Sequence, residues 1–437
     1  MKVLFIAPSH FSIGELHNAL CLAKQIEEDG EVYFLTSEKF LWYASKSVAN
    51  VRSLTKGLKQ KEVIKQINNL FQPDAIVLAD YHNLFLESPI IDLDYLLNLH
   101  IPCFSIDSLA WGSEDRLLEN KLFKNANYNS LKKRSLIELP KIPSQFKLIR
   151  TCPVNSYKQD SENITSVKLY KEALQIDEEI RMKIRTQLGC REQDKLIMIA
   201  KSSWANLLVK MRLMEKKQYN DARFSYEYIL QELLSLYLQD FPSDTCIKLI
   251  GVSDETKFVS MKNGGKIEFV SLPFLHLEEY EQLILSCDLF ITDNITSCSM
   301  GKAVFGKIPV ISLVNHMEYE ELKTQRDSHN PTLRSIIEKW NYILPNGLYP
   351  FLVFPNGWHK ELAPLMEQND YFKCVHTCEM FDLKETSQTI FNMLYSKTEI
   401  DKLKKMQQLY INNVCNLPTI KDVIKRELGA LNHEESN

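Results

Sequence analysis

The sequence predicts an α/β protein in which two Rossmann-like domains face a cleft and C-terminal helices follow them. Short apolar runs alternate with longer amphipathic segments along most of the chain, which is typical of β/α units and parallel sheets. This alternation occurs in two successive series of similar length. The chain has 437 residues, enough for about two to three domains of ordinary size. We therefore expect one Rossmann-like domain from each series.

The first series predicts parallel strands and an opening helix. The expected strands cover residues 3–7, 32–35, 75–78, 103–106 and 146–150. Residues 16–28 are predicted to form an amphipathic helix, whose apolar face carries Leu16, Ala19, Leu20, Ala23 and Ile26. The polar run QDSENIT at residues 159–165 is the best linker candidate. The first domain is therefore predicted to cover residues 1–165.

The second series predicts another domain over residues 166–384. Its expected strands cover residues 196–200, 247–250, 267–270, 289–292 and 310–314, with helices at 226–238 and 278–286. Amphipathic helices follow over residues 385–437, and we expect them to pack across both domains. Ligands of open parallel sheets bind outside the carboxyl ends of the strands, so the cleft between the domains is the expected site.

Composition excludes several classes of protein. Lys and Arg number 52 against 56 Asp and Glu, so no bulk charge would attract nucleic acid or an anionic membrane. The 10 cysteines show neither a CxxC pair nor zinc-finger spacing, and we expect no metal site. The first residues are too short and too polar a stretch for a secretion signal, and no run reaches the ~18 apolar residues of a membrane span. A cytoplasmic protein without a nucleic-acid partner is expected.

The usual glycine-rich phosphate motifs are absent from a chain with only 13 glycines. There is no GxGxxG, and the near match to a P-loop at residues 301–307 is followed by Ile308, where a P-loop has the Ser or Thr that binds magnesium. This segment also runs from helix to strand, the reverse of the P-loop order. These features exclude a P-loop nucleotide triphosphatase.

A polar bend at residues 292–299 offers another way to hold phosphate, because it ends an expected strand and opens a helix. Hydroxyls and free N–H groups at a helix N-terminus can bind a diphosphate without a glycine loop. The surrounding residues 276–314 resemble the donor-binding core of GT-B glycosyltransferases, with D-L-x-I-T before the bend and G-K-x-P after it. The resemblance implies that the diphosphate of a nucleotide sugar is contacted by Asp293, Asn294, Thr296 and Ser297. The alternative is that this bend only caps a helix.

Neighbouring strand ends extend the resemblance. Val270 lies in the stretch where the family's backbone binds the nucleotide base, and Lys201 and Ser202 stand where the family contacts phosphate. Asn315 and His316 follow the strand after G-K-I-P, where relatives hold the donor sugar. For each position alone, a surface turn or a strand-end cap is the alternative.

One position departs from the family pattern. Gly301 stands where many relatives carry a Glu that binds the ribose hydroxyls. Glu318, in the next loop, could substitute for it. The resemblance therefore leaves the identity of the nucleotide open.

The first strand-to-helix turn supplies the candidate base. The string S-I-G-E, which ends at Glu15, resembles the S-V-G-E of Kdo transferases, a GT-B family whose Glu is the proposed base. His10 is the second candidate and His82 the third, while a purely structural turn is the alternative. Asp80 resembles the Asp that orients the catalytic His of plant-type glycosyltransferases. Beside Glu15, a second carboxylate would raise one pKa toward the working range.

The resemblance implies a glycosyltransferase that moves a sugar from a nucleotide diphosphate sugar, with a UDP-sugar as the expected co-substrate, to an acceptor hydroxyl or amine. The second domain would bind the donor, and the first would bind an acceptor that is a small molecule, a peptide or a glycan. No further cofactor and no metal are expected. Two alternatives stay open: a nucleotide-sugar hydrolase or epimerase of the same fold, and a non-catalytic partner subunit.

Overall fold

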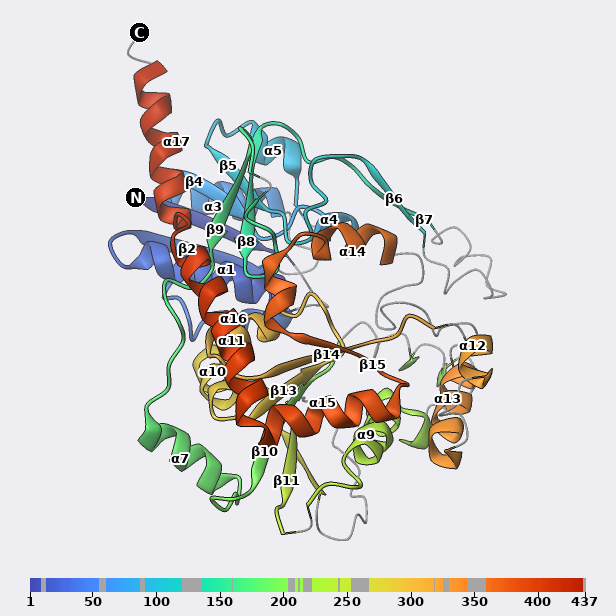
Figure 1. Ribbon diagram of the computed structural model, residues 1–437. Helices are drawn as coiled ribbons and strands as arrows, with labels where there is room; N and C mark the ends of the chain where they lie inside the picture. The colour runs from blue at the N-terminus through green and yellow to red at the C-terminus, as the bar shows by residue number, and fades with distance from the viewer. Residues whose placement is uncertain are drawn as a thin grey trace.

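The computed structural model of this protein describes residues 1–8, 13–54, 60–86, 91–119, 136–158, 160–202, 209–210, 213–214, 222–242, 244–252, 267–317, 319–324, 330–343 and 359–434. Two parallel sheets, one above the other in Figure 1, form the body of the molecule, and helices cover them.

The first sheet has seven parallel strands within the described residues, in the order β3-β2-β1-β4-β5-β8-β9. They are β1 (Lys2–Ala7), β2 (Glu31–Ser37), β3 (Val51–Leu54), β4 (Ala75–Leu78), β5 (Cys103–Ile106), β8 (Phe146–Cys152) and β9 (Ile164–Lys168). Alternate residues of β1 point to opposite faces, since Val3 and Phe5 join one core cluster and Leu4 and Ile6 join another. Both faces of the sheet are therefore covered, as is usual for parallel sheets.

Helices and one hairpin complete the first domain. The helices are α1 (Gly14–Glu27), α2 (Leu41–Ala44), α3 (Gln60–Phe71), α4 (Asn83–Leu86) and α5 (Leu93–Leu97), with a 3₁₀ turn at Glu38–Phe40. All five predicted apolar positions of α1 are buried. The antiparallel hairpin β6 (Arg116–Glu119) and β7 (Leu136–Leu139) extends beyond the sheet toward α14 (His359–Met366), as Figure 1 shows.

The second sheet has six parallel strands within the described residues, in the order β12-β11-β10-β13-β14-β15. They are β10 (Lys195–Ala200), β11 (Ile247–Val252), β12 (Ile267–Leu272), β13 (Leu289–Thr292), β14 (Val310–Val314) and β15 (His376–Glu379). On one face lie α7 (Glu178–Gln187), α10 (Leu277–Leu285) and α11 (Cys298–Phe305). On the other lie α9 (Tyr226–Tyr237), α13 (Pro331–Ile343) and α15 (Leu383–Tyr395), and a 3₁₀ turn at Ala222–Phe224 and α12 (Tyr319–Thr324) adjoin them.

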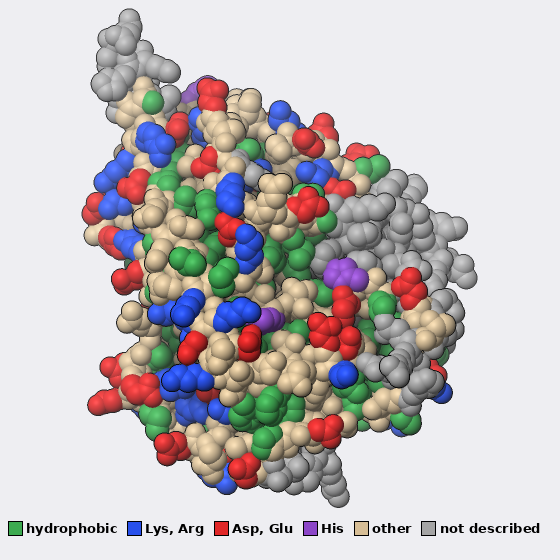
Figure 2. Space-filling model, viewed as in Figure 1, with side chains coloured by type: hydrophobic (Ala, Val, Ile, Leu, Met, Phe, Trp, Pro, Cys, Tyr) green, Lys and Arg blue, Asp and Glu red, His purple; other side chains and the backbone are tan. Residues whose placement is uncertain are grey.

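The C-terminal helices return to the first domain. A 3₁₀ turn at Asp370–Cys374 packs against α16 (Lys397–Cys415), and α17 (Ile420–Glu434) packs against α1 and β9. Lys421 of α17 pairs with Asp29 at 2.7 Å. Figure 2 shows positive and negative side chains side by side over this face. No helix in the described ranges combines the length and apolar character needed to cross a membrane.

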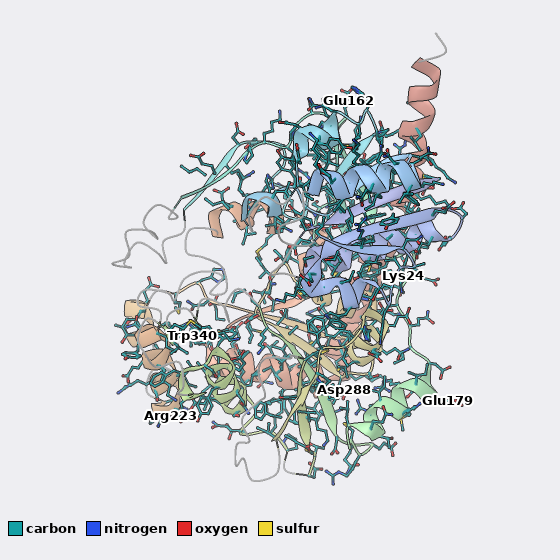
Figure 3. The ribbon with its side chains drawn as sticks, turned by 180° about the vertical axis from the view of Figure 1, so that it is seen from behind. Lys24, Glu162, Glu179, Arg223, Asp288 and Trp340 are labelled. Carbon is teal, nitrogen blue, oxygen red and sulfur yellow. The ribbon has the colours of Figure 1, made fainter. Side chains whose placement is uncertain are left out.

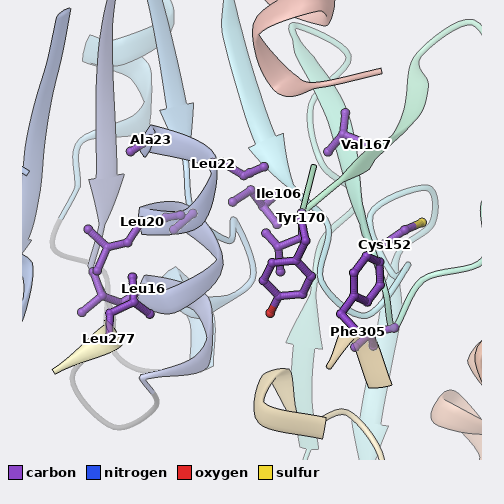
Figure 4. Packing of buried hydrophobic residues seen from close by; sticks show 14 of the residues in the cluster. Leu16, Leu20, Leu22, Ala23, Ile106, Cys152, Val167, Tyr170, Leu277 and Phe305 are labelled. Carbon is purple, nitrogen blue, oxygen red and sulfur yellow. The ribbon is translucent and has the colours of Figure 1, made fainter. Parts of the chain in front are cut away.

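One hydrophobic core runs through both domains. It contains Leu16 and Leu20 of α1 together with Leu277 of α10 and Phe305 of α11, as Figure 4 shows. The ring of Tyr170, in the connection between the domains, lies 4.9 Å from the ring of Phe305. The domains are therefore packed directly against each other.

The strand predictions are confirmed with small differences at their ends, and so is the prediction of two Rossmann-like domains. Five of the described strands were missed: β3, β9 and β15 of the two parallel sheets, and the antiparallel pair β6 and β7. The linker prediction at residues 159–165 is wrong, because the described part of this polar run leads into β9 and Asp160 accepts the backbone N–H of Ser166 at 3.1 Å. The predicted boundaries also cut elements of structure, since residues 165 and 166 both lie in β9 and residues 384 and 385 both lie in α15.

Candidate functional site

Each sheet has a point at which its strand order reverses, and four of the predicted site residues lie at these two points. The reversal falls between β1 and β4 in the first sheet and between β10 and β13 in the second. Open α/β sheets bind ligands at the carboxyl ends of the strands beside such a point. Glu15 and Asp80 stand at the first point, and Ser202 and Asp293 stand at the second.

The first turns of α1 and α11 meet between the domains. The Cys298 thiol donates to the carbonyl oxygen of Gly14 at 3.5 Å. A second contact between the domains joins α1 to α10, where Lys24 pairs with Glu278 at 2.9 Å. Figure 3 shows Lys24 on the side of the first domain that faces the second. Two helix N-termini thus converge, and each carries a partial positive charge that favours an anion.

Glu15 lies in the first turn of α1, where this convergence occurs. Its Oε2 atom is buried and makes no hydrogen bond to any part of the chain that the structure describes. The charge of Glu15 contributes to a raised pKa of the Cys298 thiol in α11, although burial of the thiol is the largest cause. The charge of Glu15 in the first domain therefore acts on the Cys298 thiol in the second domain.

Asp80 is buried beside Glu15. Its Oδ1 atom accepts the backbone N–H of His82 at 2.9 Å. Burial raises the pKa of Asp80 to about 8, and the negative charges of Glu15 and Asp107 add to the effect. At neutral pH, Asp80 therefore holds a proton, and the negative charge of Glu15 is one of the causes.

Asp107 and Arg150 form a buried ion pair next to this carboxyl pair, and neither was predicted as a site residue. The Nε atom of Arg150 donates to Asp107 Oδ2 at 3.2 Å. Asp107 Oδ1 accepts the backbone N–H groups of Trp111 at 2.8 Å and Gly112 at 3.0 Å. The sequence signal was present, since D-S-L-A-W-G directly follows β5. Its partner, 43 residues further along on β8, could not be identified from the sequence alone.

Substitution of Asp80 by Asn should change how stability depends on pH. The folded protein keeps a proton on Asp80 up to about pH 8, whereas the unfolded chain releases it near pH 4, so raising the pH through this window favours unfolding. The Asp80→Asn variant lacks this penalty, which amounts to at most about 1.4 kcal/mol per pH unit. We expect the melting temperature of the wild type to fall relative to that of Asp80→Asn as the pH rises from 5 to 8.

Asp401, exposed on α16, provides the control for this experiment. The melting temperature of Asp401→Asn should depend on pH in the same way as that of the wild type. If the melting temperature of Asp80→Asn also depended on pH as that of the wild type does, Asp80 would not be the group that keeps its proton in the folded protein.

The polar bend after β13 is organised by its own side chains. Asn294 Oδ1 accepts the N–H of Thr296 at 3.0 Å and its hydroxyl at 2.9 Å. Ser297 caps α11, since its Oγ accepts the N–H of Met300 at 3.4 Å. Asn294 and Ser297 therefore have the turn-forming and helix-capping roles that were the alternative to ligand binding.

Lys201, Ser202 and Asp293 form a connected group between β10 and β13. The N–H of Ser202 donates to Asp293 Oδ1 at 2.7 Å. Lys201 Nζ pairs with Glu227 Oε1 of α9 at 2.6 Å. Burial lowers the pKa of Lys201, while the charges of Glu227 and Asp293 raise it. The positive charge of Lys201 is therefore already balanced inside the protein.

Asn315 and His316 shape the loop that follows β14. The Asn315 amide donates to the carbonyl oxygen of Met317 at 2.7 Å. The backbone N–H of His316 donates to Glu379 Oε2 at 3.0 Å, and its ring hydrogen-bonds the same carboxylate. His316 is half-exposed and accessible at the carboxyl end of the sheet, whereas Asn315 is buried.

The remaining candidates lie apart from this convergence or outside the described ranges. Val270 lies in β12, the edge strand of the second sheet, two strands away from β10. The ring of His82 hydrogen-bonds the carbonyl oxygen of Pro140 at 3.2 Å, so it is engaged within the first domain. His10 and Glu318 lie outside the described residues.

Gly301 has a structural explanation. A Cβ atom at this position would lie 2.7 Å from Cγ of Pro153, which follows β8 in the first domain. The side-chain direction at Gly301 therefore points into the packed domain interface. A side chain at this point would have to displace Pro153, so packing between the domains explains why a glycine stands here.

Comparisons with known proteins give a family and a set of similar folds. One family model, described as a family of unknown function, matches residues 22–432. No curated protein matches the sequence. Among the described residues there is also no group of three or more His, Cys, Asp or Glu side chains that could hold a metal ion.

Three solved structures illustrate the fold similarity. A glycosyltransferase from Rickettsia africae is 12% identical, with a TM-score of 0.49 and coverage of 98% of this chain and 97% of that one. The glycosyltransferase SnogD from Streptomyces nogalater is 10% identical, with a TM-score of 0.47 and coverage of 98% and 99%. A structure described as a UDP-N-acetylglucosamine 2-epimerase from Listeria monocytogenes is 9% identical, with a TM-score of 0.47 and coverage of 94% of each chain. Similarity at this level says nothing about what this chain binds.

Proposed function

We propose that this chain, which belongs to the DUF6365 family, transfers a glycosyl group from a nucleotide diphosphate sugar to an acceptor hydroxyl or amine. The observation that carries the proposal is the meeting of α1 and α11 at their first turns, with the buried Oε2 of Glu15 in the same turn of α1 and without a hydrogen-bond partner among the described residues. Glycosyl transfer needs a base for the acceptor and a positive environment for the departing diphosphate within a short distance of each other. In this proposal the first domain supplies the base, Glu15, and the second domain supplies the positive environment, the N-terminus of α11.

Glu15 is the base in this proposal. Its carboxylate takes the proton of the acceptor hydroxyl or amine as the acceptor oxygen or nitrogen attacks the anomeric carbon of the donor sugar. Asp80 supports this step by holding a proton next to Glu15, so that the pair carries one negative charge rather than two. The bond between the anomeric carbon and the diphosphate breaks, and the diphosphate leaves with its electron pair.

The N-terminus of α11 stabilises the departing diphosphate in this proposal. The N–H groups of Met300 and Gly301 already donate to Ser297, so those of Cys298 and Ser299 are the ones that donate to phosphate oxygens in this proposal. Ser297 and Thr296 add hydroxyls at the same turn. The donor is expected to be a UDP-sugar, and neither a metal nor a further cofactor takes part in the proposal.

A nucleotide panel tests this function. The purified chain is titrated with UDP, dTDP, GDP, ADP and CDP and then incubated with the corresponding nucleotide sugars, with and without pooled acceptor alcohols, amines, peptides and glycans. We expect at least one diphosphate to bind and its release from the sugar conjugate to accelerate when an acceptor is added. The product is identified by its added glycosyl mass.

The alternatives give different results in the same assay. Diphosphate release that no acceptor accelerates would indicate a hydrolase, and conversion of the sugar without release would indicate an epimerase. Absence of binding to every nucleotide would contradict the proposal and favour a non-catalytic subunit.

A further inference from the structure

Two buried polar atoms at the carboxyl edge of the second sheet have no hydrogen-bond partner among the described residues. They are Oδ2 of Asp293 and Oγ of Ser202. The two residues are only 3% and 2% exposed. Native proteins leave few buried polar atoms unpaired, because water has been removed from them without replacement. A ligand group that supplies the missing partners is one explanation for such a pair.

The two atoms belong to residues that are already joined. The backbone N–H of Ser202, just after β10, donates to Oδ1 of Asp293, just after β13, at 2.7 Å. These strands flank the reversal of strand order in the second sheet. The helices that follow β10 and β13 pack on opposite faces of the sheet, and folds of this kind bind their ligands beyond such strand ends.

The charges around this pair disfavour a phosphate group. The Lys201 ammonium is paired with Glu227 at 2.6 Å, and Asp293 adds a further acidic group. Burial raises the pKa of Asp293 to about 7, while its hydrogen bond with Ser202 and the charge of Lys201 lower that pKa. Near neutral pH the carboxyl group is therefore present in both forms, and the local charge is neutral to negative.

A hydroxyl group matches this chemistry. Asp293 accepts a hydrogen bond when ionised and can donate one when protonated, and the Ser202 hydroxyl can donate or accept. A ligand hydroxyl is likewise both a donor and an acceptor, so one such group can satisfy both unpaired atoms. A phosphate, which at neutral pH mainly accepts hydrogen bonds, would lie against an acidic side chain.

We propose that Asp293 and Ser202 form a subsite that binds a hydroxyl group of the nucleotide sugar, on its ribose or on its sugar. The inference rests on the function proposed above and deepens it. It also accounts for the missing carboxylate at Gly301, since Pro153 fills the space there and a strand end supplies a carboxyl group instead. In this arrangement the N-terminus of α11, and not the residues that follow β10, contacts the phosphate groups.

Ser202→Ala tests the subsite, with Asp293→Asn as the second variant. The probes are UDP, GDP and ADP, their 2′-deoxy forms and their glucose conjugates, titrated by calorimetry. We expect each variant to weaken binding of the hydroxyl-bearing probe by about tenfold, the loss of one hydrogen bond to a buried group. We also expect the melting temperature of unliganded Ser202→Ala to stay the same or to rise, because the substitution removes a buried hydroxyl that has no partner.

The arms of the experiment distinguish the source of the hydroxyl. A loss seen with ribonucleotides but absent with their 2′-deoxy forms assigns the subsite to ribose, and a loss seen only with glucose conjugates assigns it to the sugar. Ser312→Ala is the matched control, because Ser312 Oγ on the neighbouring β14 is also buried and unpaired within the described chain.

Three results would overturn the inference. Unchanged affinity in both variants, with the wild type still binding nucleotides, would refute the subsite alone and leave the proposed function standing. An equal loss of nucleotide affinity in Ser312→Ala would show that removing any buried hydroxyl from this sheet weakens binding. A wild type that binds none of the five nucleoside diphosphates of the panel above would refute the proposed function and the subsite with it.

Discussion

Glu15→Gln should abolish glycosyl transfer while leaving nucleotide diphosphate affinity within about twofold. The amide has almost the same size as the carboxylate but cannot take a proton from the acceptor, and general-base catalysis typically contributes about 10²- to 10⁴-fold to the rate. We expect kcat to fall by at least about 10²-fold and the KM for the donor to change little. Rates with the donor identified by the nucleotide panel, together with calorimetric titration of the diphosphate, provide the two measurements.

Glu38→Gln is the matched control for this experiment, because Glu38 is an exposed carboxylate in the same domain. It should retain the activity of the wild type. Near-normal turnover in Glu15→Gln would eliminate Glu15 as the base and promote His10, the second candidate from the sequence. A parallel loss of diphosphate affinity would indicate that Glu15 holds the domain arrangement rather than the acceptor proton.

Gly301→Glu should destabilise the packing between the domains. The new side chain would start 2.7 Å from Pro153 Cγ, and its carboxylate would lie in a buried interface. An uncompensated buried charge costs roughly 3–5 kcal/mol, and over-packing adds roughly 1–3 kcal/mol. We expect a strongly lowered melting temperature and, in small-angle X-ray scattering, a larger radius of gyration as the domains separate.

Gly429→Glu is the matched control, since Gly429 lies in a helix and a Cβ atom there would meet nothing within 4 Å. That variant should gain stability, because Glu is a better helix former than Gly by up to about 1 kcal/mol. Gly301→Ala should lie between the two, with a clash at Cβ but no charge. If Gly301→Glu were stable and bound nucleotides more tightly, the position would face the ribose and the packing explanation would fail.

The strands that the sequence located best are those whose residues are all buried. Each residue of β4 and of β13 is apolar or buried, and the predicted ranges 75–78 and 289–292 match the structure at both ends. By contrast, β9 has the sequence ITSVK and was missed, and its first two residues were assigned to a linker. It lies at the edge of the sheet, where polar residues are tolerated and the apolar pattern fades.

The sequence could predict which candidate site residues follow the carboxyl ends of neighbouring strands, but not which side chains bond to one another. Glu15 and Asp80 follow neighbouring strands of a parallel sheet, so their proximity follows from the strand order that such folds adopt. The partners of other groups are not predictable in this way. The Asp107 and Arg150 pair joins positions 43 residues apart, and the Ser202 and Asp293 bond joins positions 91 apart.

The sequence by itself determined the two series of β/α units, the face of α1 that is buried and the polar strand ends at which a site could form. These features depend on periodicity and on side-chain type within short segments, and both can be read along the chain. Only the tertiary structure decided that α1 and α11 meet at their first turns, that Asp80 holds its proton and that Gly301 packs against Pro153. Those outcomes depend on burial and on distances between segments remote in sequence, and burial is what raises the pKa of Asp80 and leaves no space for a side chain at Gly301.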